Sequence, residues 1–138
     1  MIIILDSCLL LIVLKAQIAH SGAINGTAID LVNKNVVSGD DKGVLNFWQF
    51  NPPKLIARMK LPSGVTMFRL DRLNSLLAVA LDNGELGVVD ILRRQLARHF
   101  KMAHSSDAAV TALEISRDGK WLLSTDNKNY LKVFVFYF

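Results

Sequence analysis

The sequence predicts an all-β fold made of repeated units of four short antiparallel strands. Two observations lead to this prediction. Three segments of about twenty residues align without gaps when Asp30, Asp71 and Ser116 are placed in register, and the offsets between them are 41 and 45 residues. Within each segment, apolar residues recur with a period of two between turns rich in Asp, Asn and Gly, which is typical of strands joined by tight turns.

Each unit contains a polar turn, a short apolar strand and then a second turn. The apolar strands fall at residues 36–38, 77–79 and 122–124. The second turns fall at residues 41–43, 82–84 and 127–129. Asp, Asn and Gly at these turns supply the positive φ angles and the local hydrogen bonds that a hairpin requires.

The next strand of each unit places apolar side chains on one face at alternate positions. These side chains are Leu45 and Phe47, Leu86 and Val88, and Leu131 and Val133. Residues 55–61 and 95–101 complete the first two units as fourth strands, and no segment shows a helical period. A four-stranded unit of 41 to 45 residues has the size of one propeller blade.

We therefore predict a partial β-propeller with about three four-stranded antiparallel blades, at residues 20–61, 62–103 and, incomplete, 104–138. Residues 1–19 are predicted to end a preceding blade, because Asp6 lies fourteen residues before His20 just as Asp90 lies fourteen before His104. The alternative is a secretory signal peptide formed by the apolar residues 2–4 and 9–14. Against it, no Lys or Arg precedes the apolar run, and Asp6 interrupts it.

The third unit shows only three strands, and its last six residues are apolar and uncharged. A blade buries its faces only against its neighbours, so a propeller needs more copies than this sequence contains. We expect the chain to be part of a longer protein, and to associate or fold poorly when it is alone.

The composition excludes several other classes of protein. Hydrophobic residues make up 51% of the chain and charged residues 20%, which excludes a disordered chain. A single cysteine, Cys8, excludes an internal disulfide framework. The net charge of +4 is compatible with a nucleic-acid partner without requiring one.

No constellation of residues predicts catalysis or a cofactor. The eight glycines form no phosphate-binding loop, and no serine lies in a nucleophile elbow. His99 and His104 lack the spacing of a zinc pair, and no second cysteine accompanies them. Asp40 and Asp41 are adjacent, so on a strand they point to opposite faces; we interpret both as turn residues. The predicted protein is not an enzyme and holds no metal or cofactor.

A basic cluster, Arg93, Arg94, Arg98 and Lys101, lies on or beside the outermost predicted strand of the second unit. A row of cations there could meet RNA phosphates or an acidic protein. The alternative is that charge on an edge strand blocks pairing between sheets.

The units resemble WD repeats at specific positions. The resemblance is carried by residues 19–22, 36–39 and 45–48, and again by residues 116–123 and 131–134. It implies a structural signature at His20, Ser38, Trp48, Asp90 and Phe134. In the WD pattern an Asp stands six residues before the Trp, whereas this sequence has Lys42, Asn83 and Lys128 at that position, with Asp41 one place early.

Residues 28–30, 47–50, 77–82 and 88–91 further resemble a WD-repeat subunit of the small-subunit processome, of the UTP-B subcomplex, over about residues 17–134. This resemblance implies a scaffold of the nucleus and nucleolus that binds protein subunits of a large ribonucleoprotein during ribosomal RNA processing. RNA would be a direct or an indirect partner, and neither a membrane nor a small-molecule substrate is expected. The alternatives are a WD-repeat adaptor of another intracellular complex, part of a propeller hydrolase or, if residues 1–19 are a signal peptide, a secreted protein.

Overall fold

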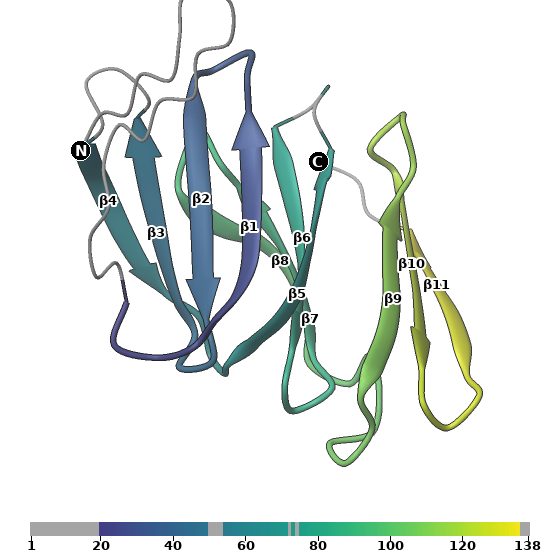
Figure 1. The fold of residues 1–138 in the computed structure, drawn as a ribbon. Coiled ribbons are helices and arrows are strands. Elements are labelled where there is room, and N and C mark those ends of the chain that lie inside the picture. Colours follow the sequence, from purple (N-terminus) through teal and green to yellow (C-terminus); the bar gives the residue numbers. More distant parts are fainter. Residues whose placement is uncertain (1–19, 50–53, 72, 74, 136–138) are drawn as a thin grey trace, which may run out of the picture.

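The computed structural model describes residues 20–49, 54–71, 73 and 75–135, and within them it contains eleven strands in three antiparallel sheets (Figure 1). The first sheet consists of β1 (Ile24–Asp30), β2 (Asn35–Asp40), β3 (Val44–Gln49) and β4 (Lys54–Lys60). The second consists of β5 (Val65–Asp71), β6 (Leu76–Leu81), β7 (Leu86–Asp90) and β8 (Gln95–Phe100). The third consists of β9 (Val110–Ile115), β10 (Trp121–Asp126) and β11 (Leu131–Val135).

Each sheet is a simple meander in which neighbouring strands of the sequence pair antiparallel. The predicted all-β, antiparallel units are therefore confirmed, with four, four and three strands among the described residues. Residues 1–19, predicted as the end of a preceding blade, lie outside the part of the chain that the structure describes. No helix in the described part is long and apolar enough to cross a membrane.

Glycines at two equivalent turns provide the positive φ that the sequence pattern predicted. Gly43 has a φ of 82° and Gly84 a φ of 81° in the β2–β3 and β6–β7 turns. Asn129 takes the same left-handed conformation in the β10–β11 turn, with a φ of 67°. Asn tolerates this region better than most residues, so one backbone shape serves all three turns.

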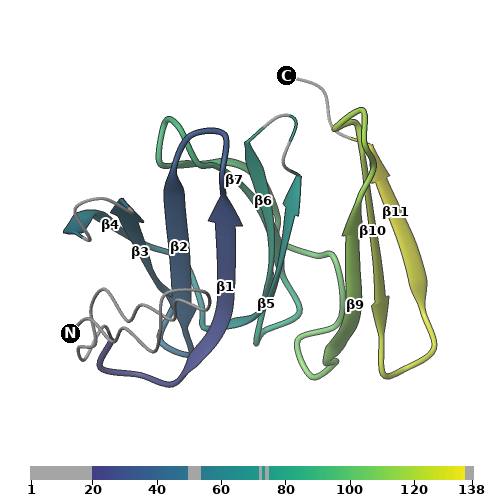
Figure 2. The same cartoon turned by 45° about the horizontal axis from the view of Figure 1, so that its top comes forward.

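The three sheets stack face to face, with the second sheet in the middle (Figures 1 and 2). Strand β6 shows how this works, because all six of its residues are buried. Leu77, Val79 and Leu81 belong to the core cluster shared with the first sheet. Leu76, Ala78 and Ala80 belong to the cluster shared with the third sheet. The period of two therefore sends alternate side chains of one strand into two different cores.

Aromatic packing brings the first two sheets close together. The Phe68 ring of β5 lies over the backbone of β1 and β2 at Gly26 and Gly39. A Cβ atom at Gly26 would lie only 2.7 Å from Cδ2 of Phe68, so this contact requires glycine.

Polar side chains also link neighbouring sheets. The Asn25 side chain donates a hydrogen bond of 2.9 Å to the carbonyl of Val65. The Asn33 side chain donates one of 2.8 Å to Oγ of Ser75. Arg69 donates one of 3.2 Å from Nε to the carbonyl oxygen of Leu113. These bonds fix the position of each sheet on the next, as a stiff framework requires.

The outer face of the third sheet is apolar and exposed. Trp121, Leu123, Leu131 and Val133 all lie on it. Leu131 is 62% exposed, whereas Leu45, at the equivalent position of the first sheet, is completely buried against the second sheet. In the first and second sheets, the equivalent apolar face is covered by the next sheet. In the third sheet this face is exposed.

Candidate interaction surface

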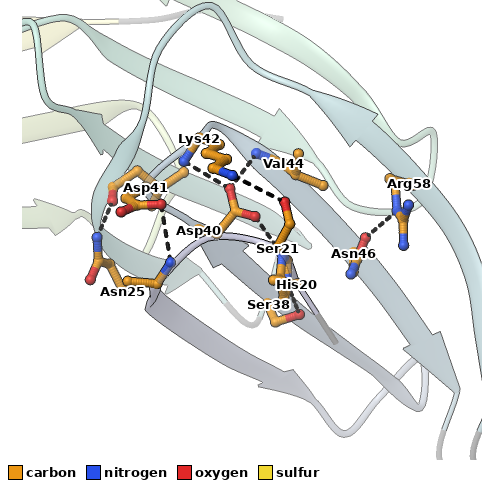
Figure 3. A network of polar contacts seen from close by, with 12 residues as sticks. His20, Ser21, Asn25, Ser38, Asp40, Asp41, Lys42, Val44, Asn46 and Arg58 are labelled. Carbon is orange, nitrogen blue, oxygen red and sulfur yellow. Dashed lines mark hydrogen bonds and ion pairs between the residues drawn. The ribbon is translucent and has the colours of Figure 1, made fainter. Parts of the chain in front are cut away.

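A buried polar network connects the chain before β1 to the β2–β3 turn (Figure 3). The His20 ring lies 2.7 Å from Oγ of Ser38 through Nε2, and 2.9 Å from Oδ2 of Asp40 through Nδ1. The indole Nε1 of Trp48 donates to the same Ser38 hydroxyl at 3.0 Å. The backbone amides of Lys42 and Val44 donate to Oδ1 of Asp40 at 3.0 and 2.9 Å. This network closes the turn and holds the incoming chain against the sheet.

The third sheet repeats most of this arrangement. His104 lies 2.6 Å from Oγ of Ser124 and 2.7 Å from Oδ2 of Asp126. Oδ1 of Asp126 accepts hydrogen bonds from the amides of Lys128 and Tyr130. Phe134, which takes the place of Trp48, has no N–H to donate, and its ring instead packs on Phe100 with 4.8 Å between ring centroids.

The second sheet replaces the whole network with apolar side chains. Leu61, Val79, Leu81 and Val89 lie 41 residues after His20, Ser38, Asp40 and Trp48, and all four are buried in one core cluster. Asn83, which follows Lys42 by the same interval, accepts a hydrogen bond of 3.1 Å from the amide of Glu85. The turn therefore keeps a side-chain acceptor even though the buried acid is absent.

The interpretation of Asp40 as a turn residue is wrong. Asp40 is the last residue of β2 and is 1% exposed, whereas the exposed Asp41 lies in the turn and accepts a hydrogen bond from the amide of Ala23. Asp40 and Asp126 supply the carboxylate that the sequence pattern placed two residues later. The signal was present in the sequence, since both units read Ser-x-Asp at residues 38–40 and 124–126.

Asp90 takes no part in this network. It ends β7, and its Oδ1 accepts a hydrogen bond of 3.0 Å from the amide of Arg93. Asp90 thus stabilises the β7–β8 turn, the turn that carries the first two arginines of the basic cluster.

Both network carboxylates have a lowered pKa. Burial alone would raise the pKa of Asp40, but hydrogen bonds from the Val44 amide, the His20 ring and the Lys42 amide together hold it below its ordinary value. For Asp126, burial would likewise raise the pKa, and the Tyr130 amide, the His104 ring and the Lys128 amide lower it. The ionised carboxylate is thus the form that the fold stabilises.

The predicted basic cluster lies on the outer edge of the second sheet. Arg93 and Arg94 occupy the β7–β8 turn, Arg98 lies in β8, and Lys101 follows it, and all four residues are exposed. Nε of Arg93 lies 3.9 Å from a carboxylate oxygen of Asp90, a distance too long for a strong ion pair. The neighbouring His99 points to Glu85 instead, with its Nε2 at 2.7 Å from Oε2.

The outer strand of the first sheet is also basic, which the sequence reasoning missed. Strand β4 exposes Lys54, Arg58 and Lys60, and Arg58 donates from Nε to Oδ1 of Asn46 at 2.8 Å (Figure 3). Neither residues 54–60 nor residues 91–101 contain an Asp or Glu. We call these seven residues the outer-strand basic surface: Lys54, Arg58, Lys60, Arg93, Arg94, Arg98 and Lys101. The signal was the recurrence of cations on the fourth strand of consecutive units.

The described residues contain no group of three or more His, Cys, Asp or Glu side chains that could hold a metal ion.

Comparison with known proteins shows that the chain is similar to WD-repeat proteins. No protein-family model matches it. It is 33% identical over 106 residues to the human WD repeat-containing protein 36, a match that covers 77% of this chain and 12% of the human protein. The chain is homologous to part of a WD-repeat protein. Its three antiparallel sheets are consistent with WD-repeat blades, and the predicted resemblance and fold class are confirmed.

Two fungal relatives are similar over the same share of the chain. The U3 small nucleolar RNA-associated protein 21 of Saccharomyces cerevisiae is 30% identical over 105 residues, and its homologue in Schizosaccharomyces pombe is 30% identical over 101 residues. These matches cover 76% and 73% of this chain but only 11% of each relative. The chain therefore spans a small part of the relatives that it matches.

Proposed function

We propose that this chain is a non-catalytic WD-repeat scaffold module of the small-subunit processome, acting with the U3 ribonucleoprotein in ribosomal RNA processing in the nucleolus. The observation that carries the proposal is the 30% identity to two proteins named for their association with U3 small nucleolar RNA, over about three quarters of the chain. We further propose that the sheets are blades with limits at residues 20–61, 62–103 and 104–138, preceded by the end of another blade at 1–19.

The stacked sheets support a mechanism of recognition. Apolar cores on both sides of β6, together with side-chain hydrogen bonds between sheets, keep the outer strands in fixed positions. Loops and edges held on a stiff framework bind partners with little loss of conformational entropy. The partners that we propose are protein subunits of the ribonucleoprotein, together with RNA at the outer-strand basic surface.

The outer-strand basic surface also fits the alternative that its charges only keep the edge strands from pairing with other sheets. Strands β4 and β8 are the last strands of their sheets, and charge on an edge strand discourages pairing with another sheet. The seven cations lie within two segments, residues 54–60 and 91–101, that contain no acidic residue, and this asymmetry favours binding to an anionic polymer.

The test is recovery of U3 RNA with the protein. An epitope-tagged copy of the complete chain is expressed in the cells that encode it, and the co-purified RNA is quantified against the U1 and U2 small nuclear RNAs. Selective enrichment of U3 and of processome proteins is the expected result. Enrichment of another complex would favour a WD-repeat adaptor elsewhere, and release of a hydrolysed product by the purified protein would favour a propeller hydrolase.

A further inference from the structure

A second polar feature lies beyond the outer strands, in a hollow between the second and third sheets. The hollow has a volume of about 420 Å³ and is bounded by residues of the β6–β7 turn, the β8–β9 loop and β11. Its polar lining comes from Asn83, Glu85, Lys101, Ser105, Ser106 and Lys132. Such a volume falls within the range of small-ligand sites, and can hold one nucleotide-sized group.

The positive charge of the hollow is only partly neutralised by nearby acids, because two lysines and one acid line it. Lys101 and Lys132 form no ion pair with any residue that the structure describes. No carboxylate oxygen of those residues lies as close to either ammonium nitrogen as in the other ion pairs of the molecule. The one acid in the lining, Glu85, already binds the ring of His99 at 2.7 Å. Asp107, close by in the same loop, binds Nζ of Lys128 at 2.6 Å. Two ammonium groups are therefore left to face an anion.

An aromatic ring stands next to one of these lysines. Nζ of Lys132 lies 5.9 Å from the centroid of the Tyr130 ring, and Tyr130 is 60% exposed. A cation beside an open aromatic face is the combination that binds a phosphate and stacks the attached base in single-stranded nucleic acids. An acidic peptide would use the cations but would gain nothing from the ring.

The hollow is continuous with the outer-strand basic surface. Lys101 belongs to both, because it follows β8 directly and lines the hollow. Arg98 pairs with Val88 across the strands, and Val88 belongs to the core facing the third sheet, so Arg98 lies on the same side of β8 as the hollow. Cations thus extend from the β7–β8 turn, along β8, to Lys132 on the neighbouring sheet.

We propose that this hollow, together with the Tyr130 ring that lies beside it next to Lys132, is a binding site for single-stranded RNA, in which Lys101 and Lys132 bind a backbone phosphate and Tyr130 stacks on the adjacent base. The hydroxyl group of Ser106 at the rim can donate to phosphate or to the ribose 2′-OH, whereas the Ser105 hydroxyl already donates to Asp107. The inference rests on the proposed function for its partner class, and it assigns the RNA contact to named residues.

The experiment uses the complete 138-residue chain and a fluorescently labelled oligouridine of about ten nucleotides, a length typical of the site size of single-strand binders. Binding is compared between the native chain, a K101M/K132M variant, a Y130A variant and a control, K120M, whose exposed lysine lies in the β9–β10 turn. Methionine keeps the aliphatic length of lysine without the charge, and circular dichroism compares the folding of all four chains.

K101M/K132M is expected to weaken binding at least about tenfold and to reduce the slope of log affinity against log salt by about 0.7 for each phosphate that the variant no longer neutralises. Y130A should weaken binding roughly 5- to 100-fold and leave the salt slope unchanged. Equal binding by native chain, K101M/K132M and K120M would overturn the proposal. Displacement of the RNA by a polyglutamate peptide that binds as tightly, with no effect of Y130A, would also overturn it, in favour of an acidic protein partner.

Ultraviolet cross-linking in cells tests the site without relying on the isolated chain. The tagged native protein should cross-link to RNA through the peptide that contains Tyr130, and K101M/K132M should lose that cross-link. If U3 RNA still co-purifies while no RNA cross-links to this peptide, the site is wrong and the proposed function stands. If neither U3 nor the cross-link is recovered, the proposed function fails with it.

Discussion

Nδ1 of His20 lies 2.9 Å from Oδ2 of Asp40, and both side chains are almost completely buried, with 0% and 1% of their surface exposed. A buried carboxylate of this kind is tolerated only when its hydrogen-bonding capacity is used. In the first sheet both oxygens of the Asp40 carboxylate accept hydrogen bonds. In the second sheet the positions equivalent to the four network side chains are all apolar. The fold thus accepts either a buried carboxylate whose oxygens are hydrogen-bonded or an apolar side chain in its place, and the third sheet shows that the indole donor is dispensable.

The first prediction concerns the hydroxyl at the centre of the network. Ser38→Ala removes the partner of both the His20 ring and the Trp48 indole N–H. Because the indole N–H and the ring nitrogen are left without a hydrogen-bond partner, the free energy of unfolding should fall by about 1–3 kcal/mol. Urea denaturation followed by tryptophan fluorescence measures this change, with S21A, which truncates an exposed serine of the same segment, as the control. An equal effect of S38A and S21A would contradict the network's role.

The second prediction exchanges the whole network for its counterpart in the second sheet. The five-fold variant H20L/S38V/D40L/K42N/W48V gives the first sheet the residues found 41 positions later. It should be less destabilising than S38A and H20A added together, because polar groups and their partners disappear at the same time. Thermal melting measures it.

Lys42→Asn is the informative member of this set. Without Asp40, the amide of Val44 needs another acceptor, and Asn83 provides it for the equivalent amide in the second sheet. The four-fold variant that keeps Lys42 should therefore melt at a lower temperature than the five-fold variant. The reverse order of melting temperatures would show that the second turn does not depend on a side-chain acceptor.

The third prediction concerns acid. The pKa values of Asp40 and Asp126 in the folded chain lie below the ordinary value of 3.8, so their contribution to stability is complete above that pH and is lost as the pH falls through the folded pKa. The free energy of unfolding should decrease as the pH falls below about 4. In D40N the decrease should be shallower, since one of the responsible carboxyls no longer titrates.

Salt distinguishes these buried acids from an exposed one. Hydrogen bonds from Lys128 and Ser105 lower the pKa of Asp107 to about 2, but this carboxylate lies at the surface. Salt screens exposed pairs much more than buried ones. At high salt the contribution of Asp107 to the pH dependence should shrink, whereas the difference between the native chain and D40N should persist. Loss of that difference in high salt would mean that Asp40 is accessible to solvent.

The sequence predicted the repeating sheets well because strand period and turn chemistry are local properties. The short apolar run at residues 77–79 identifies a strand, and Asn-Gly at residues 83 and 84 identifies the turn that follows. Which core each side chain enters is not local, since it depends on how a neighbouring sheet, 41 residues away, packs against the strand. The role of Asp40 was missed for a similar reason: its partner, His20, lies on the far side of β1 in the sequence. The hollow was missed because Lys101 follows the last strand of the second sheet and Lys132 lies in the third sheet, so the packing of the two sheets brings both lysines to one hollow.

The fourth prediction tests the close approach of the first two sheets. A Cβ atom at Gly26 would lie 2.7 Å from the Phe68 ring, so Gly26→Ala should destabilise the chain by about 1–3 kcal/mol. In the Phe68→Leu background the same substitution should cost much less, because the clashing ring is gone. A double-mutant cycle measured by urea denaturation quantifies this coupling. Additive effects of the two substitutions would mean that the sheets do not meet at Gly26.

The fifth prediction separates binding from edge protection at the outer-strand basic surface. The variant R93E/R94E/R98E reverses three charges on one edge, and R117E/K120E, in the β9–β10 turn, serves as a control that changes charge elsewhere. If the surface binds RNA, the first variant should lose U3 recovery and RNA affinity with no change in its state of association relative to the native chain, because three phosphate contacts become repulsive. If the charges only block pairing between sheets, glutamate would do so equally well, and U3 recovery would not change. Replacement by uncharged Gln should then promote self-association, which sedimentation velocity detects, whereas a binding surface loses RNA with either substitution.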